Sequence, residues 1–322
     1  MQMEHLSRLA VGQQRKPPII VPLDDGVTLT FRHIPAGSFR MGQRGGEANE
    51  EPVTEVFVGE FWMGETPVTL EQYGVMAGWA GLDPNPSYFE NLEDSARRPV
   101  EQVSWDDAMA VAVELRKRME ALDRLPRVHG VGLPSEAMWE YACRARTQTE
   151  YWSGDGEAAL VEVGWHGEEW VKGGTHVVAG KRRPNAFGLH DMHGNVWEWC
   201  ADVDEDDAYR MVVPGAVMPW PACGPRRKDD HRPRVLRGGS WDFTAWGCRS
   251  AYRFRRWPGL RHRLIGFRLC VFPGPVKQGP EARAESATGA KARRDDAAVA
   301  EGVDGADLNT NFPPRSGENS DA

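Results

Sequence analysis

Apolar and polar residues alternate with a period of two through much of the first 63 positions, and that period predicts short β-strands. Turn sequences such as Asp-Asp-Gly and Pro-Ala-Gly separate the alternating stretches. The strands that this pattern predicts are residues 19–23, 27–31, 33–41 and 53–63, and they follow a polar lead-in of residues 1–18.

Helical signals follow. Thr69 with Gln72, and Ser104 with Asp107, place an N-cap side chain three residues before a polar partner at the start of an apolar run. Ser135 is a third N-cap candidate. The helices predicted are residues 70–79, about 105–122, and a shorter one beginning at Ser135 with Trp139 and Cys143 facing inward.

The rest of the chain has little periodicity. Residues 151–233 read as loop rich in Gly, Trp and Pro, a length that is uncommon unless the loop is functional or internally braced. Residues 276–322 hold one aromatic residue, Phe312, and are predicted to be a disordered tail. One α+β, loop-rich domain is therefore expected over residues 19–275.

Composition supports a turn-rich fold. The 322 residues are 40% hydrophobic and include 13 Trp, 35 Gly and 23 Pro, which favours large aromatic anchors over a helical bundle. The net charge of -8 argues against nucleic-acid binding. No apolar run reaches the roughly 18 residues of a membrane span, and no signal peptide is evident, so a cytoplasmic protein is expected.

Cysteine usage excludes two kinds of site. The five cysteines form an odd set without C-x-x-C spacing, which indicates neither a disulfide framework nor a zinc site. They are Cys143, Cys200, Cys223, Cys248 and Cys270.

Residues 234–270 carry the most informative pattern. A frame of R-G-G-S-W, C-R-S-A-Y-R and I-G-F-R-L encloses positions that follow no period and mix aromatic, cationic and small side chains. Nine Arg face one acid here, and part of them is expected to pack on Trp and pair with carbonyls. The predicted recognition residues are Asp242, Phe243, Thr244, Trp246, Gly247, Phe254, Arg256, Trp257, Leu260, His262 and Leu264.

A series of motifs appears in a fixed order along residues 19–272. They are PAGSFRMG (residues 35–42), EPV (51–53), ETPVT (65–69), PVEQVSWDDA (99–108), LPSEAMWEYA (133–142), NAFGL (185–189), DMHGNVWEW (191–199), RGGSW (237–241) and GFR (266–268). This order strongly resembles the formylglycine-generating enzyme (sulfatase-modifying factor) family. The resemblance implies a variant of the C-type lectin fold with little regular secondary structure.

The resemblance leaves the chemistry open. The family's oxidase uses two cysteines five residues apart that bind copper, as suits soft thiolates and Cu(I). Cys248 lies near the first position counted from Ser240, but Arg253 stands five residues further and Ser250 at the position counted back from Pro258. No copper is expected, and a lone cysteine here is more often a buried small hydrophobe.

A sister group in this fold uses histidine-held iron to join cysteine sulfur to histidine derivatives, with ligands from an extra N-terminal helical domain. The lead-in here offers only His5, and His190 and His193 belong to the family frame. A third group, the variable proteins of diversity-generating retroelements, places a hypervariable segment in the very frame of residues 234–270. Most of the interleaved residues are reachable by adenine changes in an Asn codon, although Trp246 and Trp257 are not.

Three interpretations therefore stay open: a non-catalytic variable protein, a family member with a fixed ligand or degenerate site, and an enzyme of the family. The first predicts a monomer that binds a protein partner rather than a sugar.

The resemblance also implies a calcium loop. Asp191 and Glu198 would supply side-chain oxygens, and Gly194 and Val196 backbone carbonyls, which is hard-ligand chemistry suited to calcium. The frame tryptophans Trp105, Trp139, Trp197, Trp199 and Trp241 are expected to be buried with their N–H groups paired, whereas Trp246 and Trp257 are expected to be partly exposed.

Overall fold

The fold is described here from a computed structural model, for residues 15–273 apart from residues 25, 125–128, 170, 172, 181–182, 206–207, 220–226 and 228. All of these residues belong to one unit, residues 1–274. The predicted tail, most of the predicted lead-in and Cys223 lie outside the described residues.

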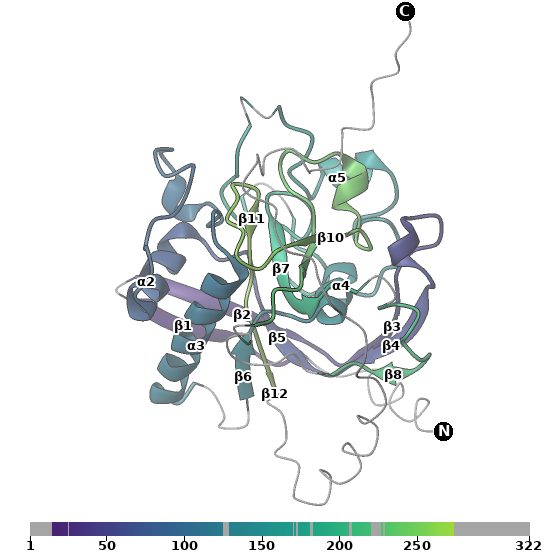
Figure 1. The fold of residues 1–322 in the computed structure, drawn as a ribbon, viewed down its shortest axis with the longest axis horizontal. Coiled ribbons are helices and arrows are strands. Elements are labelled where there is room, and N and C mark those ends of the chain that lie inside the picture. Colours follow the sequence, from purple (N-terminus) through teal and green to yellow (C-terminus); the bar gives the residue numbers. More distant parts are fainter. Residues whose placement is uncertain are drawn as a thin grey trace, which may run out of the picture. The chain divides into compact units, whose positions relative to one another are not determined.

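A five-stranded sheet brings distant parts of the chain together (Figure 1). Its order is β1-β2-β5-β12-β6, and the last strand of the described chain, β12, pairs antiparallel with both β5 and β6. The C-terminal end of the segment that precedes β12 is therefore anchored in the same sheet as the N-terminal strands β1 and β2. The strands are β1 (Ile19–Asp24), β2 (Val27–Ile34), β5 (Phe61–Gly64), β6 (His129–Gly132) and β12 (Cys270–Pro273).

A four-stranded sheet carries the frame of residues 234–270. Its order is β10-β9-β7-β11, with β9 antiparallel to both neighbours and β11 parallel to β7. A smaller sheet has the order β3-β4-β8. The strands are β7 (Trp197–Val203), β9 (Arg234–Arg237), β10 (Arg253–Arg256), β11 (Ile265–Gly266), β3 (Gly37–Met41), β4 (Thr54–Val58) and β8 (Ala216–Val217).

The helices begin where the capping signals place them. Thr69 and Ser104 each form a full capping box, with Gln72 and Asp107 as the returning partners, and the Ser135 hydroxyl accepts from the backbone N–H of Met138. The predicted helix starts are confirmed, and both long helices end within one residue of the prediction. The helices are α2 (Leu70–Ala80), α3 (Trp105–Ala121), α4 (Glu136–Arg144) and α5 (Glu157–Val161), with 3-10 turns η1 (Ala48–Glu50), η2 (Ser95–Arg97) and η3 (Ala245–Cys248).

Figure 1 shows α2 and α3 side by side. On the five-stranded sheet, α2 contacts β1 and β2, and α3 contacts β6 at the opposite edge. Helix α4 instead lies between the other two sheets, where it contacts β3 and β4 on one side and β7 and β9 on the other. This position between two sheets buries all nine residues of α4, including the charged Glu136, Glu140 and Arg144. A helix that buries charges needs partners for them from several elements.

Two strand predictions are wrong. Residues 53–63 form two strands in different sheets, because the chain turns at Gly59 and Glu60 between β4 and β5. Residues 33 and 34 extend β2, and the break falls at Pro35 and Ala36. In the stretch read as loop, β7 was missed because its first four residues are buried on both faces and so show no alternation.

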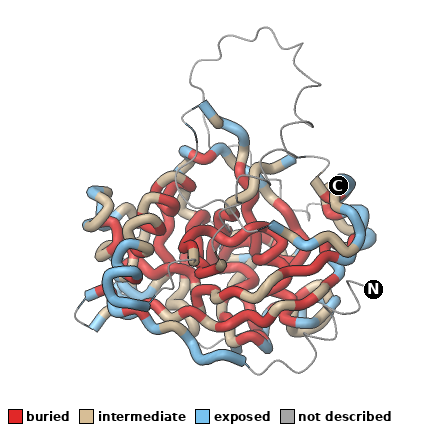
Figure 2. Tube along the Cα trace, turned by 90° about the horizontal axis from the view of Figure 1, so that it is seen from below, coloured by how far each residue is buried: buried red, intermediate tan, exposed pale blue. Residues whose placement is uncertain are grey.

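The core is built on the frame tryptophans, and buried stretches gather in the centre of the fold (Figure 2). Trp139, Trp197, Trp199 and Trp241 are fully buried and Trp105 nearly so, which confirms their predicted burial. The indole N–H groups of Trp105, Trp139 and Trp199 donate to Cys200 O, Glu198 Oε2 and Val103 O. The predicted pairing is wrong for Trp197, whose Nε1 is buried without a partner among the described residues.

Candidate recognition face and its buried support

The predicted recognition residues divide by burial. Trp246 and Trp257 are 41% and 60% exposed, which confirms the expectation for both side chains. Six more residues are partly exposed: Asp242, Thr244, Phe254, Arg256, Leu260 and His262. The segment therefore presents most of these side chains to solvent, from η3, β10 and the loop that follows.

Three of the predicted residues do not reach the surface. Leu264 is fully buried, Phe243 is 8% exposed and Gly247 is buried against it. Phe243 meets Trp197 edge to face at 5.0 Å between ring centroids, so it belongs to the core. Assigning these three to a contact face was wrong, since a segment without periodicity gives no signal for which side chains turn inward.

A stack of two aromatic rings and an arginine connects the core to the exposed part of the recognition segment. Phe254 stacks on buried Trp197, with ring centroids 5.1 Å apart. The guanidinium of Arg256 lies over the Phe254 ring at 4.1 Å, and burial lowers the pKa of Arg256 to about 10. Cation–π stacking of this kind fixes an arginine that would otherwise sample many rotamers.

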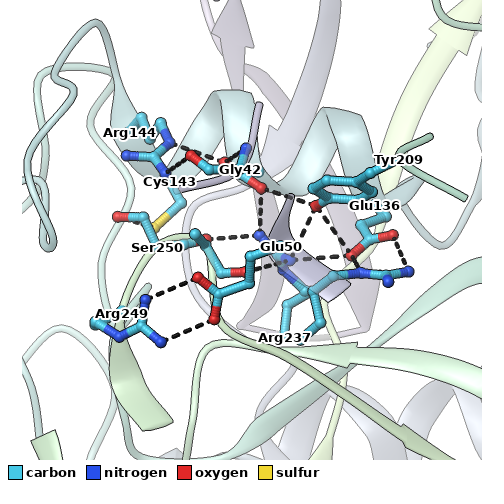
Figure 3. A network of polar contacts seen from close by, with 12 residues as sticks. Gly42, Glu50, Glu136, Cys143, Arg144, Tyr209, Arg237, Arg249 and Ser250 are labelled. Carbon is cyan, nitrogen blue, oxygen red and sulfur yellow. Dashed lines mark hydrogen bonds and ion pairs between the residues drawn. The ribbon is translucent and has the colours of Figure 1, made fainter. Parts of the chain in front are cut away.

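Trp246 is also fixed in place. Its indole N–H donates to Glu47 Oε1 at 2.9 Å, and the Arg249 guanidinium lies 3.8 Å from its ring centroid. Arg249 in turn forms a two-pronged ion pair with Glu50, both N–O distances being 2.8 Å. Arg249 and Glu50 are fully buried, and their ion pair joins η1 to the residue that follows η3 (Figure 3).

The frame rests on a buried ion network around Arg237 (Figure 3). Arg237 donates to Glu136 Oε1 at 2.9 Å, to Glu140 Oε2 at 2.6 Å, and to the carbonyls of Ser250 and Ala251. It thereby links α4, β9 and the chain that leads into β10. All of these groups lie in the interior, where each donor and acceptor needs a partner.

Two further arginines complete the network. Arg253 forms two bonds with Glu136, of 2.6 and 2.9 Å, and Arg144 donates to Glu140 Oε1 at 2.9 Å. Burial alone would raise the pKa of Glu140, but Arg144 and Arg237 hold it below its usual range. Glu140 is therefore ionised. The arginines of the frame are structural rather than free to contact a ligand. Sequence reasoning missed the glutamates, because nothing local marks a carboxylate inside a helix as buried.

The thiols of the site are not poised for redox chemistry. Cys143 and Cys248 are free and fully buried, and burial raises the pKa of each thiol to about 12. The His193 ring, 3.8 Å from Cys143 Sγ, donates from Nδ1 to Cys248 O and accepts the Trp152 N–H, and burial lowers its pKa to about 3. These residues do not fit a copper centre of two adjacent thiolates. The histidine has a structural role.

The predicted calcium loop shows features of an oxygen-ligand site. Asp191 has a left-handed backbone with φ of 54°, and its Oδ1 is buried without a partner among the described residues. Burial raises the pKa of Asp191, a cost that a bound cation would remove. Arg268 pairs with both oxygens of Glu198 at 2.7 Å, and Oε1 accepts no other hydrogen bond from the described residues, so it keeps a lone pair. The residues fit the ion, which remains a prediction.

No three His, Cys, Asp or Glu side chains gather as a metal site among the described residues. That finding does not decide the calcium loop, which uses two carboxylates and two carbonyls. No described helix has both the length and the apolar character needed to cross a membrane.

The fold and the frame define a formylglycine-generating-enzyme-type protein with a C-type lectin fold, α+β and poor in regular structure. The family described as sulfatase-modifying factor enzyme 1-like domain matches residues 28–272, so the chain belongs to that family.

Relatives of differing description share this domain. The chain is 32% identical over 254 residues to serine/threonine-protein kinase pkn1 of Chlamydia caviae, covering 73% of this chain and 37% of that protein. It thus spans little more than a third of that relative's length. Formylglycine-generating enzyme of Mycobacterium tuberculosis is 28% identical, with 74% of this chain and 97% of that protein covered. The solved structure of Treponema denticola variable protein 1 superposes with a TM-score of 0.65 at 29% identity, covering 79% of this chain and 99% of that one.

Replacing Arg237 by Met should lower the free energy of unfolding by about 3–5 kcal/mol, because Glu136 and Glu140 lose a buried counter-charge. Urea denaturation followed by tryptophan fluorescence measures the change. Arg255→Met is the matched control: its side chain is 55% exposed on the neighbouring strand, and its ion pair with Asp204 should contribute less than about 1 kcal/mol. Equal losses in the two variants would contradict the structural role of the network.

Removing calcium should lower the melting temperature of the wild-type protein, because binding to the native state stabilises it by mass action. Differential scanning calorimetry with and without a calcium chelator measures the shift. In the Asp191→Asn variant the chelator should have a smaller effect, since the neutral amide is a weaker calcium ligand. A wild-type melting temperature that does not respond to chelator, together with no heat of calcium binding in titration calorimetry, would remove the ion.

Proposed function

We propose that this chain is a non-catalytic binding protein whose recognition face is built from the exposed side chains of residues 242–262. The observation that carries the proposal is the contrast in burial between the frame arginines and two tryptophans of residues 237–268. The frame arginines Arg237, Arg249, Arg253 and Arg268 are buried in ion pairs, while Trp257 and Trp246 between them face solvent. Exposed tryptophans gathered in one segment are typical of protein interaction sites.

The chemistry of the face favours a protein partner. Tryptophan and arginine are the residue types that contribute most binding energy at protein interfaces. Trp246 and Arg256 are already held by Glu47 and Phe254, so association would cost little side-chain entropy. A pre-ordered face of this kind supports binding without a large conformational change.

The likeness to Treponema denticola variable protein 1 supports a more specific proposal, that the chain is a variable protein of a diversity-generating retroelement. In this proposal, the partly exposed residues Thr244, Phe254, Arg256, Leu260 and His262 are the positions that vary. Leu264, Gly247 and Phe243 are excluded, because their burial leaves no room for arbitrary side chains. At Gly247, for example, the Cβ of any other residue would lie 2.7 Å from Phe243 Cδ1, which is too close.

The second candidate is an oxidoreductase of the family, which the likeness to the Mycobacterium tuberculosis enzyme favours. It would need a redox-active thiol pair. Cys248 has no cysteine five residues away in the sequence, and its thiol is fully buried with a raised pKa. The binding function is the better supported of the two.

Substituting Trp257 by Ala should weaken binding to a purified protein partner by about tenfold or more, because truncating an interface tryptophan removes a large apolar contact. The partner is first isolated on immobilised wild-type protein, and its affinity is then measured by surface plasmon resonance. Val217→Ala in β8 is the control, since Val217 is 59% exposed but lies in the β3-β4-β8 sheet, away from the recognition segment. Undiminished binding by Trp257→Ala would place the interface elsewhere.

The variable-protein proposal makes a genomic prediction. The gene should lie beside a reverse transcriptase gene and a near-copy of the codons for residues 234–269 that differs at adenines. The differences should fall on the codons of exposed interleaved residues and spare those of the buried frame. A locus with neither element would leave a family member with a fixed ligand.

A peptide containing the motif C-x-P-x-R should not be oxidised when it is incubated with this protein, copper and oxygen. Without a thiol pair there is no two-coordinate copper site and no route for electrons from the substrate cysteine. Mass spectrometry of the peptide measures the outcome. Conversion of its cysteine to formylglycine would overturn the non-catalytic proposal.

A further inference from the structure

A hollow of about 300 Å³ lies beside the recognition face, between the two long helices and the loop after β10. That volume is at the lower end of ordinary ligand pockets. Its lining comes from α2, the turn after α2, the start of α3 and the recognition segment. The lining residues are Tyr73, Leu82, Asp83, Pro86, Gln102, Asp107 and Arg261.

Two polar side chains face this hollow with unused hydrogen-bonding groups. Tyr73 is only 2% exposed, yet its hydroxyl forms no hydrogen bond with any described residue. The Gln102 side-chain amide likewise has no partner in the described part of the chain, and its backbone has a left-handed φ of 61°. Tyr73 is nearly buried and Gln102 is partly exposed, and both line the hollow. Polar groups in such a position are normally satisfied by a partner, so a ligand in the hollow could bond to both.

The charges of the lining favour a cation. Asp107 is largely neutralised by Arg261, whose Nη2 lies 2.8 Å from Asp107 Oδ1. Asp83 is exposed, and its Oδ1 accepts only the Asn85 backbone N–H, so its charge has no counter-ion among the described residues. After burial, the charges that act on the pKa of Tyr73 are Asp107, which raises it, Arg261, which lowers it, and Asp83, which raises it. The hollow carries one uncompensated negative charge.

We propose that this hollow binds a lysine or arginine side chain of the partner protein, with Asp83 pairing with the cationic head and Leu82 and Pro86 contacting the aliphatic stem. The Tyr73 hydroxyl and the Gln102 amide oxygen accept hydrogen bonds from the head. An anionic group would instead have to break the Arg261–Asp107 pair and approach Asp83. This inference rests on the proposed binding function and names one element of the partner's chemistry.

The hollow is joined to the recognition face by backbone contacts. The Gln102 N–H donates to His262 O at 3.1 Å, and the Trp105 N–H donates to Pro258 O at 2.9 Å. A partner that covers Trp257 and Leu260 would therefore lie next to the opening. Arg261 comes from the recognition segment itself, so a single binding surface includes both features.

The test uses the isolated full-length chain and small probes, so it needs no partner. Nitrogen-15 NMR spectra are recorded while Nα-acetyl-lysine amide or Nα-acetyl-arginine amide is added. Saturable shifts are expected at the backbone amides of Tyr73, Asp83 and Gln102. The uncharged Nα-acetyl-norleucine amide and the anionic Nα-acetyl-glutamate amide should bind at least about tenfold more weakly, because they lack the charge-assisted bond.

Variants locate the effect. Asp83→Asn and Tyr73→Phe should each weaken binding of the cationic probes, the first by about tenfold, and Glu93→Gln should leave it unchanged because Glu93 is exposed outside the hollow. Absent saturable shifts, equal binding of the anionic or neutral probe, or insensitivity to both pocket variants would each overturn the pocket. Such a result leaves the Trp257→Ala comparison untouched, so the two proposals fail separately.

Discussion

The ion pairs of Arg237 with Glu136 and Glu140 are the interaction on which the rest of the structure depends. They join α4 to β9, and through Arg253 and Arg144 they extend to β10 and to Gly42 at the end of β3. A buried ion pair adds little net stability over an apolar contact, but breaking one is costly. The network therefore specifies one arrangement of these elements and penalises every other.

This arrangement explains how one segment can be both rigid and chemically varied. The side chains that hold it point inward to fixed carboxylates, and the backbone between them is fastened by Ser250 and Ala251 carbonyls. Substituting a partly exposed residue such as Thr244 or Leu260 leaves these contacts intact. Substituting Gly239 would not, because its φ is +77° and a Cβ would lie 2.4 Å from Cys248 Sγ. Partly exposed positions of the segment therefore tolerate substitution, whereas positions packed against the frame do not.

The sequence predicted what is encoded locally. Thr69, Ser104 and Ser135 mark helix starts through bonds within three residues, and these starts are where the structure has them. Burial in the recognition segment depends on partners as far away as Glu50, 199 residues from Arg249, and no short-range pattern reports such a contact. Leu264 was therefore misplaced on the face, and the hollow beside Gln102 was not foreseen. Motif order recovered the fold because it encodes long-range contacts that periodicity cannot.

The fold of this region does not require the thiol pair that oxidase chemistry uses. No described cysteine forms a disulfide, and Cys248 packs as a small buried group. The frame therefore does not depend on a thiol pair for its structure. Charge pairing supports the frame instead. Exposed positions near η3 can then change without loss of the buried contacts. Trp246, within η3, combines the two properties, because Glu47 and Arg249 hold its ring while 41% of it stays exposed.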